Sequence, residues 1–224
     1  MPIQSTIISL FALLFAITVH EASHAWTAMK FGDPTASAMG RVSLNPLVHI
    51  DPIGTVILPL LLVFVLKAPA FGWAKPVMVD PRNLRHPRRD NLWISFAGPA
   101  ANLSTAAVSL LLILGIKAAS PGAIAFVARY LNGQQVGTVP LGIIALILFY
   151  FVFVNCYLAV FNLIPVPPLD GSGVLSGLLS SEAATAYERI RPFGFIIVVA
   201  LIMLGALDII MRPILHLIAG LIFS

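Results

Sequence analysis

Long apolar runs alternate with shorter polar segments along the chain. The runs cover residues 3–28, 52–68, 91–116, 139–163 and 192–211. All but one reach the roughly 20 residues that a helix needs to cross the hydrocarbon core of a bilayer. The pattern therefore predicts an all-α membrane protein, a polytopic helix bundle with about five apolar segments in the lipid bilayer.

The run at 52–68 departs from this pattern. It is short, contains Pro59 and connects two segments that are rich in basic residues. Basic residues collect on the cytoplasmic side of a membrane protein, so a single crossing here would place those two segments on opposite sides. We therefore expect a re-entrant hairpin or a short out-and-back excursion, covered by neighbouring protein. The basic segments of the chain are 30–41, 75–89 and 189–191.

Two segments on either side of this run have a strand-like composition. They are GRVSL at 40–44 and KPVMV at 75–79. We expect them to form a small β element at the cytoplasmic rim, whose edge would accept an extended peptide. Pro76 favours an edge position, because proline has no N–H to donate to a partner strand. The alternative is two loops without regular structure.

Composition and charge narrow the class of protein. The hydrophobic fraction is 59% and the charged fraction 10%, whereas soluble domains are roughly half apolar. The polar connections are short, so we expect a single transmembrane domain over residues 1–224. The formal net charge of +4 comes from loop residues that report membrane orientation. No nucleic-acid partner is expected.

Three ionisable residues interrupt the first apolar run. His20 and His24 are four residues apart, so a helix places them on one face with Glu21 beside them. Two imidazoles in this arrangement can bind one metal ion. The alternative is a pair of structural histidines bonded to neighbouring helices. Because unpartnered ionisable groups are costly inside a membrane, burial favours the metal site.

A catalytic metal site of this kind needs a third protein ligand from elsewhere in the chain. Asp170 lies in NLIPVPPLDG at 162–171, where three prolines must open the helix that ends the fourth run. Such a break suits the wall of a polar cavity. The alternative role for Asp170 is a helix N-cap, and the main rival ligand is Asp51 in NPLVHIDPIGT.

The two motifs together resemble the site-2 protease family of intramembrane zinc metalloproteases. The segments FAGPAAN at 96–102, GRVSLNPLVHIDPIGT at 40–55 and FGWAKPV at 71–77 also resemble segments of compact members of that family. The matching motif residues are His20, Glu21, His24, Asn162, Pro165, Pro168, Leu169, Asp170 and Gly171.

The resemblance implies a role for each of these polar residues. His20, His24 and Asp170 would hold one Zn²⁺ per chain, and Glu21 would be the general base. Asn162 would help to position the substrate. Two departures stand out: many members have a helix before the HExxH helix, and many carry a PDZ or CBS domain. We therefore expect a compact member without either domain.

Two further polar residues are candidates from the sequence alone. Asn102 is an amide side chain in the third run, and it would either stabilise an oxyanion or position substrate. Its alternative role is a hydrogen bond between helices. His49 would either hydrogen-bond a metal ligand or contact substrate, and its alternative is an interfacial histidine beside Asp51.

These features predict an intramembrane zinc metalloendopeptidase. Its substrates would be membrane proteins with a transmembrane helix, cleaved within or near that helix. We expect it in the cell (plasma) membrane with the active site toward the cytoplasm. One alternative is a non-catalytic zinc-binding or zinc-transport protein, which would have less need of Glu21. Another is a zinc protease with a glutamate ligand, but Glu182 and Glu188 lie in no recognisable ligand motif.

Overall fold

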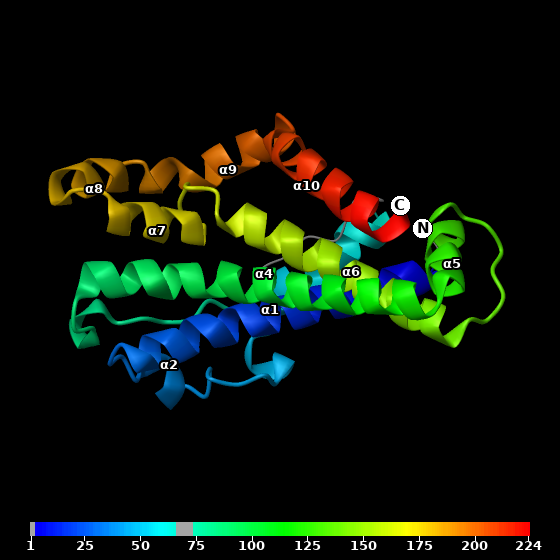
Figure 1. Cartoon of the computed structure of the whole chain (residues 1–224). Coiled ribbons are helices and arrows are strands. Elements are labelled where there is room, and N and C mark those ends of the chain that lie inside the picture. Colours follow the sequence, from blue (N-terminus) through cyan, green and yellow to red (C-terminus); the bar gives the residue numbers. More distant parts are fainter. Residues whose placement is uncertain (1–2, 66–73) are drawn as a thin grey trace.

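The computed structural model describes residues 3–65 and 74–224, apart from the side chains of Pro59 and Val63. In this part of the chain the regular structure is helical and no strand occurs. Both chain ends lie at one end of the bundle beside α5 (Pro121–Leu131), and α7 (Asp170–Leu178) and α8 (Ser181–Glu188) lie at the other (Figure 1).

Four helices of the described chain are long and apolar enough to cross a membrane. They are α1 (Ile3–Lys30), α4 (Pro87–Ala119), α6 (Pro140–Asn162) and α10 (Ala206–Phe223). The predicted runs at 3–28, 91–116 and 139–163 each lie within one of the first three helices or within one residue of its ends. The all-helical membrane class is therefore confirmed.

The last predicted run, 192–211, is not one helix. It contains the short helix η5 (Arg191–Phe193), the helix α9 (Gly194–Met203) and the beginning of α10. Gly205 separates α9 from α10 with a φ of 70°, a left-handed conformation that ends a right-handed helix. The apolar helix then continues to Phe223 with Pro213 inside it.

The described part of the run at 52–68 is a distorted helix. It consists of a π-helix η2 (Pro52–Ile57), one α-turn α3 (Leu58–Leu60) and a second π-helix η3 (Leu61–Val65). Residues 66–68 lie outside the described residues. Many of its apolar side chains are exposed, including Ile53, Ile57 and Phe64. A re-entrant excursion stays a prediction for this segment.

The predicted β element is wrong, because neither 40–44 nor 75–79 forms a strand. The backbone N–H groups of the second segment have other acceptors. Lys75 N donates to the carbonyl of His49 at 3.0 Å, and Val77 N donates to the carboxylate of Glu21 at 3.2 Å. Pro76 between them has no N–H, so no donor is left at 75–77 to pair with a neighbouring strand.

Helix α4 lies at the centre of the packing and contacts α1, α6 and α7. Its contact with α7 is close because Gly173 and Gly177 present no side chain. A Cβ atom on Gly173 would lie 2.1 Å from Ser95 Oγ, and one on Gly177 would lie 2.5 Å from Leu92 Cβ. These two glycines, one helical turn apart, bring the first residue of α7, Asp170, against the bundle.

The rest of the described fold consists of a hydrophobic core and short connecting elements. The main hydrophobic core joins α4, α5, α6 and α10 and includes Ile113, Val127, Val152 and Met211. The short elements on the side of α1 are α2 (Thr35–Ala38), η1 (Pro46–Val48) and η4 (Pro81–Asn83).

Candidate metal centre

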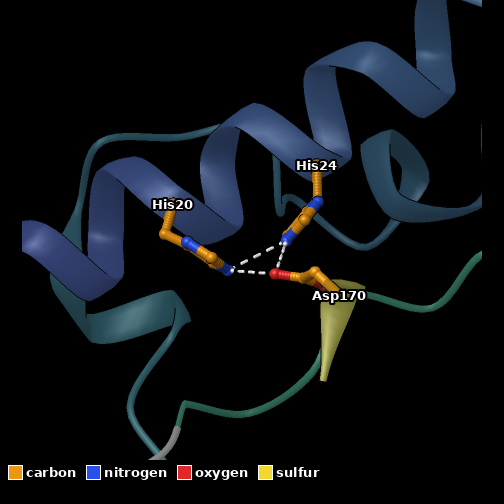
Figure 2. A group of neighbouring side chains, drawn as sticks. All are labelled: His20, His24 and Asp170. Atoms are coloured by element: carbon orange, nitrogen blue, oxygen red, sulfur yellow. Dashed lines mark hydrogen bonds and ion pairs between the residues drawn. The ribbon is translucent and has the colours of Figure 1, made fainter. Parts of the chain in front are cut away.

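The structure brings together three of the predicted site residues. His20 and His24 point from one face of α1 toward Asp170 at the start of α7 (Figure 2). The two Nε2 atoms are 3.0 Å apart. Asp170 Oδ2 lies 2.9 Å from Nε2 of His20 and 3.3 Å from Nε2 of His24. Two motifs far apart in the sequence therefore form one group, with both histidines buried and Asp170 half-buried.

The hydrogen bond behind His24 defines its tautomer. Its Nδ1 lies 2.6 Å from the carbonyl oxygen of Ile94 on α4. A carbonyl can only accept, so Nδ1 must carry the proton and donate. In the neutral imidazole, Nε2 then presents its lone pair to the site.

A chain of buried amides defines the tautomer of His20 in the same way. Asn155 Nδ2 donates to the carbonyl of Phe151 at 2.8 Å, which turns Asn155 Oδ1 toward Asn102. Asn102 Nδ2 donates to that oxygen at 2.8 Å and to the carbonyl of Ala16 at 3.0 Å.

The amide oxygen of Asn102 therefore faces His20 Nδ1, at 2.7 Å. Because this oxygen can only accept, Nδ1 of His20 carries the proton and Nε2 presents its lone pair. Asn102 and Asn155 are fully buried, so no water competes for these bonds.

Three acceptor atoms thus converge with no proton between them. Asp170 Oδ2 is buried and receives no hydrogen bond, although it lies at contact distance from both imidazoles. In a tetrahedral zinc site with metal–ligand bonds of about 2.0–2.2 Å, two neighbouring ligand atoms are about 3.3 Å apart. The observed separations of 2.9 to 3.3 Å are close to that value. This donor set fits a metal ion better than it fits a hydrogen-bonded cluster.

Gly98 of α4 keeps space open beside the two imidazoles. A Cβ atom on Gly98 would lie 2.4 Å from Nε2 of His24 and 2.7 Å from Nε2 of His20. The side chain of any other residue at position 98 would therefore occupy the space next to both lone pairs. The close approach of α4 to α1 therefore leaves room for an ion at this point.

Glu21 is the fourth predicted residue of the site, and it has a partner outside the metal group. Its half-buried carboxylate accepts the hydrogen bond from the backbone N–H of Val77. The extended segment 74–80 therefore runs beside the site. This segment is held at one end by His49, through the bond from Lys75 N, and at the other by Asp33.

Asp33 is a buried carboxylate with several donors. It accepts hydrogen bonds from the hydroxyl and backbone N–H of Thr35, from Asn83 Nδ2, and from the backbone N–H of Asp80. Burial raises the pKa of Asp33, but the hydrogen bonds that it accepts lower the pKa by more, so the pKa lies below its ordinary value. Asp33 joins the end of α1 to the segment that contacts Glu21.

The other predicted residues do not join the metal group. Asp51, the rival third ligand, caps η2 by accepting from the N–H groups of Ile53 and Gly54. His49 is buried, its Nε2 donates to the carbonyl of Ser43, and its Nδ1 has no partner. Asn162 Nδ2 donates to Leu158 of its own helix at 3.0 Å.

Sequence reasoning missed two residues of the site. Asn155 is an uncharged amide in the middle of the fourth apolar run, and this position was a signal for a buried polar contact. Gly98 lies in the quoted segment FAGPAAN. A glycine in a helix predicts a close approach, but the sequence does not reveal that the approaching groups are the two histidines.

Comparison with known proteins agrees with this chemistry. The sequence pattern of a family described as "Peptidase family M50" matches residues 8–205. Over 191 residues the chain is 32% identical to a Bacillus subtilis protein named "Putative zinc metalloprotease YwhC", covering 84% of this chain and 77% of that protein. It is 31% identical over 197 residues to "Putative zinc metalloprotease Rip2" of Mycolicibacterium smegmatis, covering 87% of this chain and 66% of the relative. No solved structure matches the chain.

Proposed function

The chain belongs to peptidase family M50, the site-2 proteases, and we propose that it cleaves membrane proteins within or near their transmembrane segments. Membership of this family and the names of its relatives make the chain a membrane zinc metalloprotease. The proposal adds the substrate class, the roles of individual residues and the membrane orientation. It treats residues 1–224 as one transmembrane metalloprotease domain.

The convergence of His20, His24 and Asp170 is the observation that carries the proposal. These three residues would hold the zinc. Bound zinc supplies Lewis acidity, which activates water and polarises a carbonyl group. The partners behind the imidazoles, Ile94 and Asn102, hold each ring in the orientation and tautomer that a metal ligand requires.

Glu21 would move the proton. Glu21 is adjacent to His20 in the sequence, and its carboxylate is not part of the group that would hold the metal. It can therefore serve as the proton acceptor. It would take a proton from the attacking water and return it to the leaving amine. The N–H of Val77 holds this carboxylate in place without neutralising it.

The roles of the other three residues follow from their partners. Asn102 would orient His20 and would not contact an oxyanion, because its donors are already bonded to Ala16 and Asn155. The free Nδ1 of the buried His49 would accept a hydrogen bond from substrate. Asn162 would contact substrate after releasing its bond to Leu158.

The distribution of charge supports the proposed orientation. Arg82 lies in the connection that leads into α4, Arg89 lies in the first turn of α4, and Arg191 precedes α9. The start of α4 and the segment between α8 and α9 lie toward the end of the bundle that holds α7 and α8 (Figure 1). By the positive-inside rule this end would face the cytoplasm. The proposed membrane is the plasma membrane.

The test combines zinc content with cleavage of a single-span membrane-protein reporter. Glu21→Gln is expected to keep zinc and to lower the cleavage rate by at least about a hundredfold, since it removes the proton acceptor. Asp170→Ala and His24→Ala are expected to lose both zinc and cleavage. Asp51→Ala is the matched control, because it removes a carboxylate that caps η2, and it should keep its zinc.

Three outcomes would count against the proposal. Full zinc content in Asp170→Ala would break the ligand set. Undiminished cleavage by Glu21→Gln would remove the proposed proton acceptor. Zinc binding by the wild type without cleavage of any single-span reporter would favour the zinc-transport alternative instead.

A further inference from the structure

Three polar residues form a stripe along α10 that the proposed function does not use. Asp208, Arg212 and His216 follow one another at intervals of four residues, so they lie on one face of the helix. All three are exposed. Because α10 is one of the helices apolar enough to cross a membrane, this stripe needs an explanation.

The stripe lines a cavity of about 460 Å³ between α10 and α6. The α6 side of the cavity is formed by Phe153 and Tyr157, and Figure 1 shows α9 and α10 as a bent outer layer beside α6. Asn155, which is bonded to Asn102 of α4, lies two residues from each of these and so on another face of α6. Helix α6 therefore separates the cavity from the metal centre.

The charges of the stripe make no ion pair within the described part of the single chain. Within residues 3–65 and 74–224, neither Asp208 nor Arg212 makes an ion pair, although they are one turn apart. A charged side chain within a membrane-crossing helix costs several kcal/mol unless it finds a partner or water. An acidic and a basic group side by side form a surface that is complementary to a second copy of itself.

We propose that the α10 stripe is the interface between two copies of this chain, with Asp208 of each copy paired to Arg212 of the other. Two copies inserted in the same orientation are related by a two-fold axis along the membrane normal, which places equal residues at equal depth. Helical side chains lean toward the N-terminal end of their helix. The long side chain of Arg212 therefore reaches toward the depth of the partner's Asp208, and both pairs form at once.

Other features of the helix suit this contact. Ala219 continues the same face and allows close approach of two helices farther along. His216 extends the polar face by one turn and can hydrogen-bond across the interface. The proposal is independent of peptidase activity, because the stripe and the metal centre lie on different faces of α6.

The test is charge reversal with mixing, on the full-length protein in liposomes. Two populations that carry different fluorescent tags report association by energy transfer. Asp208→Arg alone and Arg212→Asp alone should each lower the association constant by about tenfold or more, because like charges then face one another. A mixture of the two variants should recover association, since each supplies the charge that the other lacks. An ion pair within one helix would not be restored by mixing.

Controls keep the result interpretable. Glu182→Lys changes an exposed charge on α8, away from the stripe, and should associate as the wild type does. Zinc content and thermal melting of each variant establish that it is folded. Asp208→Asn and Arg212→Gln are milder variants, and each should weaken association without repulsion.

Three results would overturn the proposal. The first is a wild-type protein that stays monomeric at all protein-to-lipid ratios, in which case the stripe meets lipid or a different protein. The second is undiminished association of both single reversals. The third is failure of the folded variants to associate when mixed.

Discussion

The metal centre and the α10 stripe are two sets of polar residues in the same apolar bundle, and they differ in how their hydrogen-bonding groups are satisfied. At the metal centre, Asn155 bonds Asn102 and Asn102 bonds His20, and each of these residues is buried. In the stripe, Asp208 and Arg212 are exposed and make no ion pair within the described chain.

The metal centre finds its hydrogen-bond partners within one chain, whereas the α10 stripe does not find ion-pair partners within the described residues. In a low-dielectric environment a polar group is retained only when its partner is present. The metal centre carries its partners on α1, α4 and α6, so one chain can assemble it. Asp208 and Arg212 make no ion pair within the described residues, and the proposed dimer would supply their partners from a second copy. The following predictions test this contrast.

The largest effect is expected from filling the space beside the imidazoles. Gly98→Ala places a methyl group 2.4 Å from Nε2 of His24, so zinc affinity should fall by more than about a hundredfold. Elemental analysis of the purified variant measures the zinc. Gly115→Ala, in the same helix and with no atom within 4 Å of its Cβ position, should keep its zinc. Normal zinc content in Gly98→Ala would refute the assigned position of the ion.

The next effect tests the amide chain. Asn155→Ala leaves one donor of Asn102 without its acceptor and loosens the residue that orients His20. Zinc affinity, measured by competition with a chelator, should fall by about 10- to 100-fold, as for other residues that orient metal ligands. Ser104→Ala is the control, because this hydroxyl bonds only its own helix on an exposed face. Equal zinc affinity in both variants would make Asn155 a packing residue only.

A smaller effect is expected at Asp33, a buried charge with all its partners in one chain. Asp33→Ala should lower the free energy of unfolding by about 1–3 kcal/mol at pH 7, because it leaves the donors on Thr35 and Asn83 unpaired. Thermal melting followed by intrinsic fluorescence measures this change.

The pH dependence of Asp33 has a definite sign. Its pKa is lowered by folding, so its contribution is fully present above the ordinary carboxyl pKa of about 4 and is lost as the pH falls through the lower folded value. The difference in stability between wild type and Asp33→Ala should therefore shrink below about pH 4. A difference that grows on acidification would contradict the assignment.

The smallest effect on the metal is expected from the stripe. Asp208→Asn should leave zinc affinity within about twofold of the wild type, because additivity holds for distant sites without shared partners. The same chelator competition as for Asn155→Ala gives a direct comparison. A large loss of zinc in Asp208→Asn would show that the two polar sets are coupled.

The fold could be predicted from the sequence wherever apolar length alone decides it. The helices at 3–30, 87–119 and 140–162 follow from long apolar runs. The last run was misjudged because Gly205 interrupts it without changing its hydropathy. The strands at 40–44 and 75–79 were misjudged because composition does not specify hydrogen-bond partners, and the N–H groups of Lys75 and Val77 have acceptors elsewhere.

The candidate site divides in a similar way. His20, Glu21 and His24 could be grouped from helical spacing, and Asp170 from a proline-rich break that suits a cavity. The alternative role predicted for Asn102, a hydrogen bond between helices, is confirmed. Its partner His20 could not be predicted, because that contact depends on which face of α4 meets α1 and on the direction of one amide. Asn155 depends on a third helix as well, and pairwise spacing in a sequence does not encode such a contact.

The origin of the ligands on separate helices has a consequence for biosynthesis. His20 and His24 enter the membrane early in translation, while Asp170 emerges only after α6 is complete. With the proposed ligand set, the nascent amino-terminal helix would not offer zinc all of its ligands, and loading would follow the docking of α7 onto α4. Bound zinc would then stabilise only the assembled bundle, because its binding free energy is available only to that state.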